Sequence, residues 1–301
     1  MSAPSNETGS IQTLIDPNES PRKINQQSYV FTEGPSYDGN GKIYFVDNEQ
    51  SWIVAYDIPT NTLRTWAKET QGANGTAFLT SGELISCRSL ARDLALWGPD
   101  GKVKKVLASE YEGQRFNAPN DLVVSKTGWI YFTDPDFEEC HSMPESVYAL
   151  SPQGVVRRID QGIARPNGIV LMPDERALII NGTTQRELIA YDVGADGQVS
   201  NRRAFALVRD PDRQAYPGYP EKWFGCDGMA VDLEGHLYVT TGAGIQVFDH
   251  RGDFVGIVKV QQKPTNVSFG GKENRTLFVT AQSSLYCVQC KIPGVVFQQR
   301  A

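Results

Sequence analysis

Six oxygen-bearing side chains recur along the chain, each 10 or 11 residues before an apolar residue in a strand-like run. Such near-equal spacing indicates equivalent structural positions and outweighs the alternative that these residues only form turns before strands. Two carboxylates and four amides, without His or Cys, suit a hard cation better than Zn²⁺ or copper. The six are Glu33, Asn74, Asn120, Asn167, Asp227 and Asn266.

The donor set leads us to expect Ca²⁺ first. Calcium takes roughly 6 to 8 oxygen ligands at about 2.3 to 2.6 Å, so four protein ligands would leave positions for water and substrate. Mg²⁺ ranks second because it demands a tighter octahedron, and Mn²⁺ and Zn²⁺ are the further alternatives. Asn74 and Asn266 are the weakest members of the set and are expected to orient ligands or hold water.

The elements that must position these side chains form an internal repeat. Taking one apolar residue in each run as the equivalent point, the successive periods are 41, 46, 48, 59 and 40 residues, which is typical of a β-propeller. Each run has a short strand before it and a third strand after it, and a fourth segment follows in most repeats. The runs are GKIYFVD (41–47), GELISC (82–87), GWIYFTD (128–134), RALIING (176–182), GHLYVTT (235–241) and RTLFVTA (275–281).

This repeat predicts an all-β fold, a six-bladed β-propeller with four antiparallel strands per blade. The first strand of each blade lines the central channel, so the six oxygen-bearing residues should converge at one end of it. We expect residues 26–301 to form a single propeller domain and residues 1–25 to form an N-terminal extension, partly disordered or helping to close the ring. The last repeat is thin, and the sequence leaves open which end of the chain completes it.

Composition narrows the class of partner. Lys and Arg number 29 against 35 Asp and Glu, giving a net charge of −6 without a basic run, so we expect neither nucleic acid nor an anionic membrane as partner. There is no apolar stretch of membrane-spanning length and no leader-like start, so a cytoplasmic location is expected. The five cysteines are expected to be reduced thiols. The oligomeric state stays open.

Two sets of loops should wall the end of the channel where the oxygen ring lies. The loop from the second to the third strand of blade three contains Phe137 and His141, and a long loop precedes the first strand of the same blade at 111–119. The 59-residue period reflects an insertion at 209–225, rich in aromatic residues and Pro and ending near Trp223. We expect these residues to contact substrate, with the insertion serving as a lid or specificity wall or as a plain surface loop.

Several motifs, in order, resemble the SMP-30/gluconolactonase/LRE-like family: EGP, NAPNDLVV followed by GWIYFTDP, RPNGI, CDGMAVD and PTNVSFGG. The likeness runs from about residue 30 to 290. Family members are six-bladed propellers that hold a divalent cation, usually Ca²⁺, and include sugar lactonases, other lactone hydrolases and related phosphotriesterases. The resemblance implies that Glu33, Asn120, Asn167 and Asp227 are the metal ligands and that Arg115 and Asn117 contact substrate.

The resemblance further implies a metal-dependent hydrolase that opens a lactone or related ester, with Asp227 as the base that activates water. Two departures put sugar specificity in doubt. The blade-two loop reads CRSLARDL, in which Arg92 matches only loosely, and the aromatic insertion suits a bulkier ligand than gluconolactone. The alternatives are a phosphotriesterase, a biosynthetic enzyme that forms or rearranges lactones at the same site, and a non-catalytic scaffold propeller.

Overall fold

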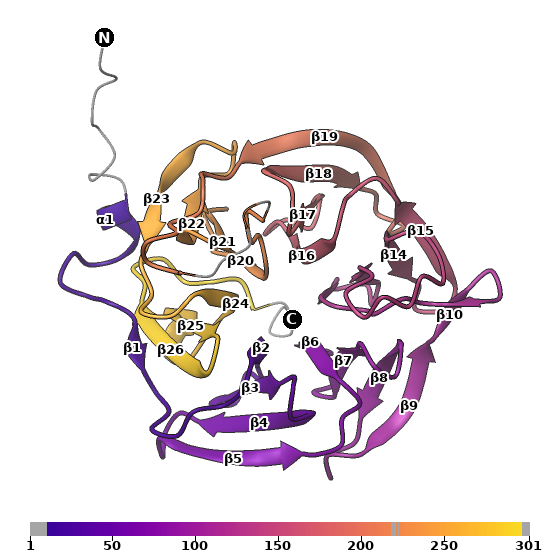
Figure 1. Cartoon of the computed structure of the whole chain (residues 1–301), viewed down its shortest axis with the longest axis horizontal. Coiled ribbons are helices and arrows are strands. Elements are labelled where there is room, and N and C mark those ends of the chain that lie inside the picture. The colour runs from indigo at the N-terminus through magenta and orange to yellow at the C-terminus, as the bar shows by residue number, and fades with distance from the viewer. Residues whose placement is uncertain (1–10, 218–220, 222, 297–301) are drawn as a thin grey trace.

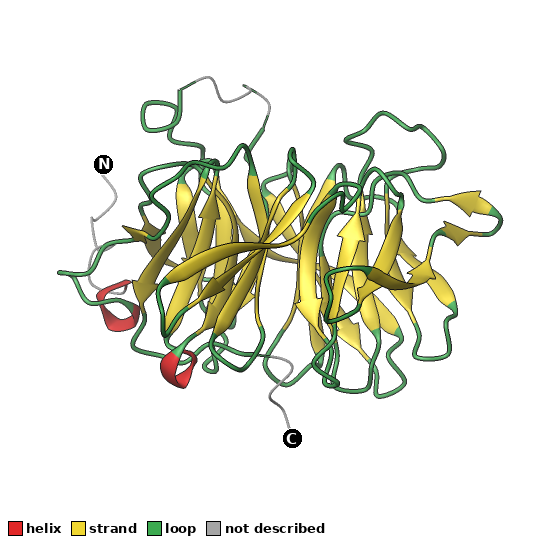
Figure 2. Ribbon diagram, turned by 90° about the horizontal axis from the view of Figure 1, so that it is seen from below, coloured by secondary structure: helices red, strands yellow, loops and turns green. Residues whose placement is uncertain are grey.

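The predicted six-bladed propeller is confirmed. In the computed structural model, which describes residues 11–217, 221 and 223–296, six four-stranded antiparallel sheets surround a central axis (Figure 1). Seen from the side, the strands run from one face of the disc to the other and the connecting loops lie on both faces (Figure 2). None of the helices among these residues has the length and apolar character needed to cross a bilayer.

Each blade runs in chain order from the channel outwards. The first three blades are β2 (Thr32–Tyr37), β3 (Lys42–Asp47), β4 (Trp52–Asp57), β5 (Thr62–Ala67); β6 (Ala73–Phe78), β7 (Leu84–Arg88), β8 (Asp93–Trp97), β9 (Val103–Ala108); and β12 (Leu122–Val124), β13 (Ile130–Asp134), β14 (Ser146–Leu150), β15 (Val156–Asp160). Blades four and five are β16 (Pro166–Leu171), β17 (Ala177–Gly182), β18 (Glu187–Val193), β19 (Val199–Leu207); and β20 (Met229–Val231), β21 (Leu237–Thr241), β22 (Gly244–Phe248), β23 (Phe254–Val258). A small hairpin, β10 (Glu110–Tyr111) with β11 (Gln114–Arg115), projects between blades two and three.

The sixth blade joins the two ends of the chain. Its inner strands are β24 (Pro264–Gly270), β25 (Thr276–Ala281) and β26 (Ser284–Gln289), with the short helix η1 (Lys272–Asn274) between the first two, and its outer strand is β1 (Arg22–Lys23). Arg22 pairs with Cys287 and Lys23 pairs with Tyr286. The N-terminal segment therefore supplies the strand that the thin last repeat lacks, and α1 (Ile11–Leu14) lies against β23 nearby. Residues 1–10 of the predicted extension lie outside the described part of the chain.

The core lies between the faces of neighbouring blades, which explains the sequence pattern. The second strands β13 and β21 are buried along their whole length, because each has a neighbouring blade on either face. The outermost strand of blade two, β9, is mostly exposed. Between blades two and three, the rings of Phe116, Phe132 and Tyr148 pack within 5.4 Å of one another. All five cysteines are free thiols.

Candidate functional site

A cavity of about 240 Å³ opens at the end of the channel where the first strands begin. The register of each blade puts its second-to-third-strand loop at the same end, since Thr32 pairs with Asp47 in blade one and Pro166 pairs with Gly182 in blade four. Five of the six predicted ring residues line the cavity, and four of them are the implied metal ligands. They are Glu33, Asn74, Asn120, Asn167 and Asp227.

Hydrogen bonds between blades hold the ring residues in place. Thr133 of blade three donates through Oγ1 to the carbonyl oxygen of Asn167 in blade four at 2.7 Å. Asn181 of blade four donates through Nδ2 to the carbonyl oxygen of Asp227 in blade five, also at 2.7 Å. The spacing of the ring is therefore set by backbone groups of adjacent blades, and its residues cannot move independently.

The glycine that follows a ring residue has a steric reason. A Cβ on Gly168 would lie 2.2 Å from the carbonyl oxygen of Asp227, and a Cβ on Gly34 would lie 1.9 Å from that of Asn74. Both distances are far below van der Waals contact, so only glycine allows the first strands to approach this closely. The recurring Glu-Gly, Asn-Gly and Asp-Gly pairs are the sequence record of this approach.

The sixth predicted ring residue, Asn266, is not among the residues that line this cavity. In blade six it follows Pro264 and Thr265, so it corresponds to the glycine of the other blades and lies one residue deeper in the channel. Its side-chain oxygen lies where a Cβ on Gly228 would sit, 1.8 Å away, and with Asp121 it lines a separate small cavity in the channel. The spacing count placed it in the ring because β24 and β25 pair with an irregular register between Pro264 and Asn266.

Glu33 and Asp227 are buried carboxylates, 4% and 9% exposed. Burial raises the pKa of Glu33 well above its usual value, and the nearby Asp227 carboxylate raises it further. Burial also raises the pKa of Asp227, while the Lys263 ammonium opposes that rise. Two carboxylates held together away from water are costly unless cationic charge compensates them.

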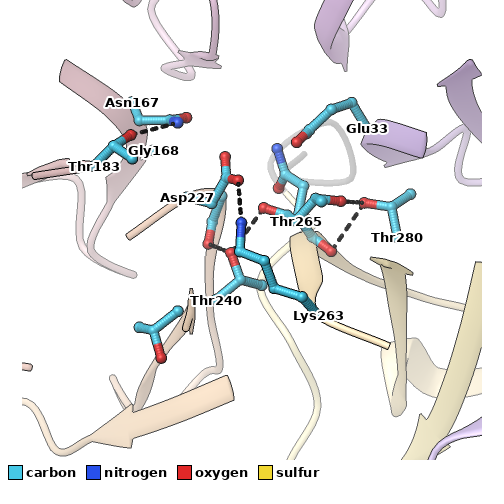
Figure 3. Close-up of polar contacts among 12 residues, drawn as sticks. Glu33, Asn167, Gly168, Thr183, Asp227, Thr240, Lys263, Thr265 and Thr280 are labelled. Carbon is cyan, nitrogen blue, oxygen red and sulfur yellow. Dashed lines mark hydrogen bonds and ion pairs between the residues drawn. The ribbon is translucent and has the colours of Figure 1, made fainter. Parts of the chain in front are cut away.

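The amide of Asn167 has one oxygen without a partner. Its Nδ2 donates to Thr183 Oγ1 at 3.0 Å, which fixes the orientation of the group (Figure 3). Its Oδ1 is buried and accepts no hydrogen bond from the described residues. An unpartnered amide oxygen beside two buried carboxylates is the donor chemistry that a hard cation requires, so the residues fit the implied metal. Within the described ranges, no three His, Cys, Asp or Glu side chains form a metal-binding group, which disfavours the ligand set typical of zinc.

Lys263 is a site residue that the sequence reasoning missed. It precedes β24, lines the cavity, and its Nζ lies 3.5 Å from Asp227 Oδ2 (Figure 3). Its side chain is only 15% exposed. A lysine directly before a proline gives no local signal of where its side chain points, so only the closed ring reveals this contact.

Aromatic side chains form part of the cavity wall. Phe137, from the loop after β13, and Trp223, from the end of the long insertion, both line it. The Arg165 guanidinium lies over both rings, 5.2 Å from the centroid of Phe137 and 5.7 Å from that of Trp223. Arg165 thus links the two elements into one wall. Residues 218–220 and 222 of the predicted lid lie outside the described residues.

The three remaining predicted substrate-binding residues do not line the cavity. Asn117 is fully buried, and its side chain holds the loop after β13 by donating to Met143 O at 2.9 Å and accepting from Ser142 N at 3.1 Å. Arg115 is exposed on the β10–β11 hairpin. The His141 side chain is 76% exposed, and its Nδ1 lies 2.6 Å from Asp136 Oδ2.

The sequence profile of the SMP-30/gluconolactonase/LRE-like region matches residues 31–283. The chain belongs to this family. A gluconolactonase of Zymomonas mobilis is 27% identical over 310 residues, covering 91% of this chain and 82% of the relative. Diisopropyl-fluorophosphatase of Loligo vulgaris is 26% identical, covering 82% of this chain and 84% of the relative. The solved structure of a Xanthomonas campestris gluconolactonase superposes with a TM-score of 0.83 at 26% identity, covering 96% and 95% of the two chains.

Proposed function

We propose that the protein is a hydrolase that opens a lactone in this cavity with the aid of a divalent cation, Ca²⁺ being the first choice. The observation that carries the proposal is the convergence of two buried carboxylates and the unpartnered Asn167 Oδ1 on one small cavity. The two similar gluconolactonases support lactones as the substrate class. Mg²⁺ is the second choice of cation.

Glu33, Asn120, Asn167 and Asp227 would hold the cation through their side-chain oxygens. When bound, the cation supplies a Lewis acid that stabilises negative charge developing on the carbonyl oxygen of the ester. Glu33, buried at the bottom of the pair, suits a permanent ligand. Asp227 is the candidate base: its carboxylate would orient the attacking water and accept its proton, while the ring C–O bond breaks and the leaving oxygen takes a proton.

A second candidate, phosphotriester hydrolysis, is favoured by the likeness to diisopropyl-fluorophosphatase over most of both chains. A phosphoryl oxygen presents the same kind of hard acceptor as an ester carbonyl, so the same residues would serve. The aromatic wall of Phe137 and Trp223 fits an apolar substituent on either substrate. Lactone formation or rearrangement is a third use of the same site.

The proposal is tested with a panel of sugar and alkyl lactones and one phosphotriester, assayed after chelation and after addition of Ca²⁺ or Mg²⁺. Asp227→Asn keeps the size of the side chain and should lower lactone turnover by about 100-fold or more. Asp249→Asn, in a turn of the same blade after β22, is the matched control and should retain activity. Turnover by Asp227→Asn at the wild-type rate, or absence of lactone turnover with every cation, would refute the proposal.

A further inference from the structure

Lys263 has the least expected side chain in the cavity. Its Nζ approaches Asp227 Oδ2 at 3.5 Å, longer than the roughly 2.7 to 2.9 Å of a charge-assisted hydrogen bond. The ammonium therefore lies in the field of Asp227 without being locked onto that carboxylate. Glu33 is close enough to feel the same positive charge. Lys263 is thus a fixed cation at the centre of the candidate metal site.

The backbone keeps this lysine in place. Lys263 is followed by Pro264, whose ring restricts the chain as it enters β24. The next residue, Thr265, donates through Oγ1 to the carbonyl oxygen of Thr32 at 2.7 Å, and Gly228 N donates to Thr265 O at 2.8 Å. The lysine is therefore carried on a segment bonded to the first strands of blades one and five. Such a segment holds the ammonium group close to the ring.

Charge bookkeeping shows which ligand this arrangement favours. Glu33 and Asp227 carry two negative charges, Lys263 carries one positive charge, and a divalent cation would add two, which leaves one excess positive charge at the buried site. Glu49 and Glu138 also line the cavity, but both are exposed, so water screens them. A neutral lactone gains little from the excess charge. A carboxylate gains much more.

We propose that Lys263 binds the carboxylate of the hydroxy acid formed when the lactone opens, so that the loaded site holds the anionic product in preference to the neutral substrate. The inference rests on the proposed function for the identity of this ligand. Opening the lactone adds water across the ester bond and yields one carboxylate and one hydroxyl group. Lys263 is adjacent to the position at which that negative charge appears, so it is a specificity-determining residue for the same site.

The test measures binding rather than turnover. Wild type, Lys263→Met, Lys263→Gln and Lys263→Arg are saturated with Ca²⁺ and titrated by calorimetry with gluconate, and with glucitol as the matched polyol that lacks the carboxylate. Lys263→Met and Lys263→Gln should lose gluconate affinity by about tenfold or more, and Lys263→Arg should keep most of it. Lys259→Met, at an exposed lysine in the same linker paired with Asp212 at 2.7 Å, should behave as wild type.

Calcium affinity supplies a readout that needs no substrate. Removing a like charge from the site should strengthen Ca²⁺ binding in Lys263→Met and Lys263→Gln, which also shows that both variants are folded around an intact ring. Equal gluconate affinity in wild type and these variants, or no preference for gluconate over glucitol, would overturn the inference even if the protein hydrolyses lactones. Lysine-dependent gluconate binding by a protein without lactone turnover would uphold the inference and refute the proposed hydrolysis.

Discussion

Gly168→Ala should damage the site without touching any candidate ligand. The new Cβ would lie 2.2 Å from Asp227 O and 2.8 Å from Asn181 Nδ2, two atoms that already hydrogen-bond to each other across the blade interface. The blades would have to separate by roughly 1 Å or more to reach an ordinary van der Waals distance of about 3.5 Å. That movement would draw Asp227 away from Asn167.

The expected cost follows from overpacking. Forcing an extra methyl group into a packed interface costs about 1 to 3 kcal/mol, partly offset by about 0.4 to 1 kcal/mol because alanine restricts the unfolded chain. Calorimetry should show a melting temperature lowered by roughly 2 to 8 °C. Calcium affinity of the same variant should also fall, because the ring residues shift together.

Gly162→Ala is the matched control for this substitution. Its added Cβ would meet only a side-chain oxygen, Asp160 Oδ1, at 3.2 Å, and that group lies on the outer strand of blade three. Its melting temperature and calcium affinity should stay near those of wild type. Wild-type stability and calcium affinity in Gly168→Ala would refute the view that close blade approach builds the ring.

Two further predictions concern charge pairs outside the cavity. The Asp232 carboxylate, 3.0 Å from His236 Nδ1, raises the pKa of His236, so the stability that the histidine adds is complete below its unfolded pKa of about 6.5 and lost as pH rises through the higher folded value. Wild type should therefore exceed His236→Gln in melting temperature by more at pH 5.5 than at pH 8.5, and an equal margin at both would contradict this. Asp93 accepts two hydrogen bonds from buried Arg88, at 2.7 and 2.6 Å, so Asp93→Ala should lose about 3 to 5 kcal/mol in urea unfolding, whereas Lys42→Ala at a half-exposed pair should lose less than about 1 kcal/mol. A loss as small as that of Lys42→Ala would show that Arg88 finds water or another acceptor.

The blade count was predictable because the propeller repeats a local pattern. Each second strand, such as β13 or β21, is a continuous run of β-branched and aromatic residues that must be buried on both faces, and this signal survives in a single sequence. The closure of the ring was not predictable. Only two residues, Arg22 and Lys23, form the outer strand of blade six, and both are charged and exposed. A polar pair of that length has no hydrophobic period.

The ring of oxygens was largely predictable because its residues share one position in a repeated element. Asn266 was placed wrongly in the ring, since a one-residue register difference in β24 moves a side chain to the next level of the channel. Asn117 follows the expected motif, but its amide is consumed by the loop after β13. Lys263 and Thr183 carry no sequence signal, because their roles depend on contacts with another blade or across the strand pair that only folding creates.

The most direct test of the central claim is a calcium titration by calorimetry on chelator-stripped wild type and Asp227→Ala, with Asp249→Ala as the control. The account predicts one tight site in wild type and in the control, and an affinity at least about 100-fold weaker in Asp227→Ala, because that variant loses one of only two carboxylates in the ring. Bound Ca²⁺ should also raise the melting temperature of wild type. Absence of binding to wild type, or equal affinity in Asp227→Ala, would contradict the account and leave the five converging residues without a metal to hold.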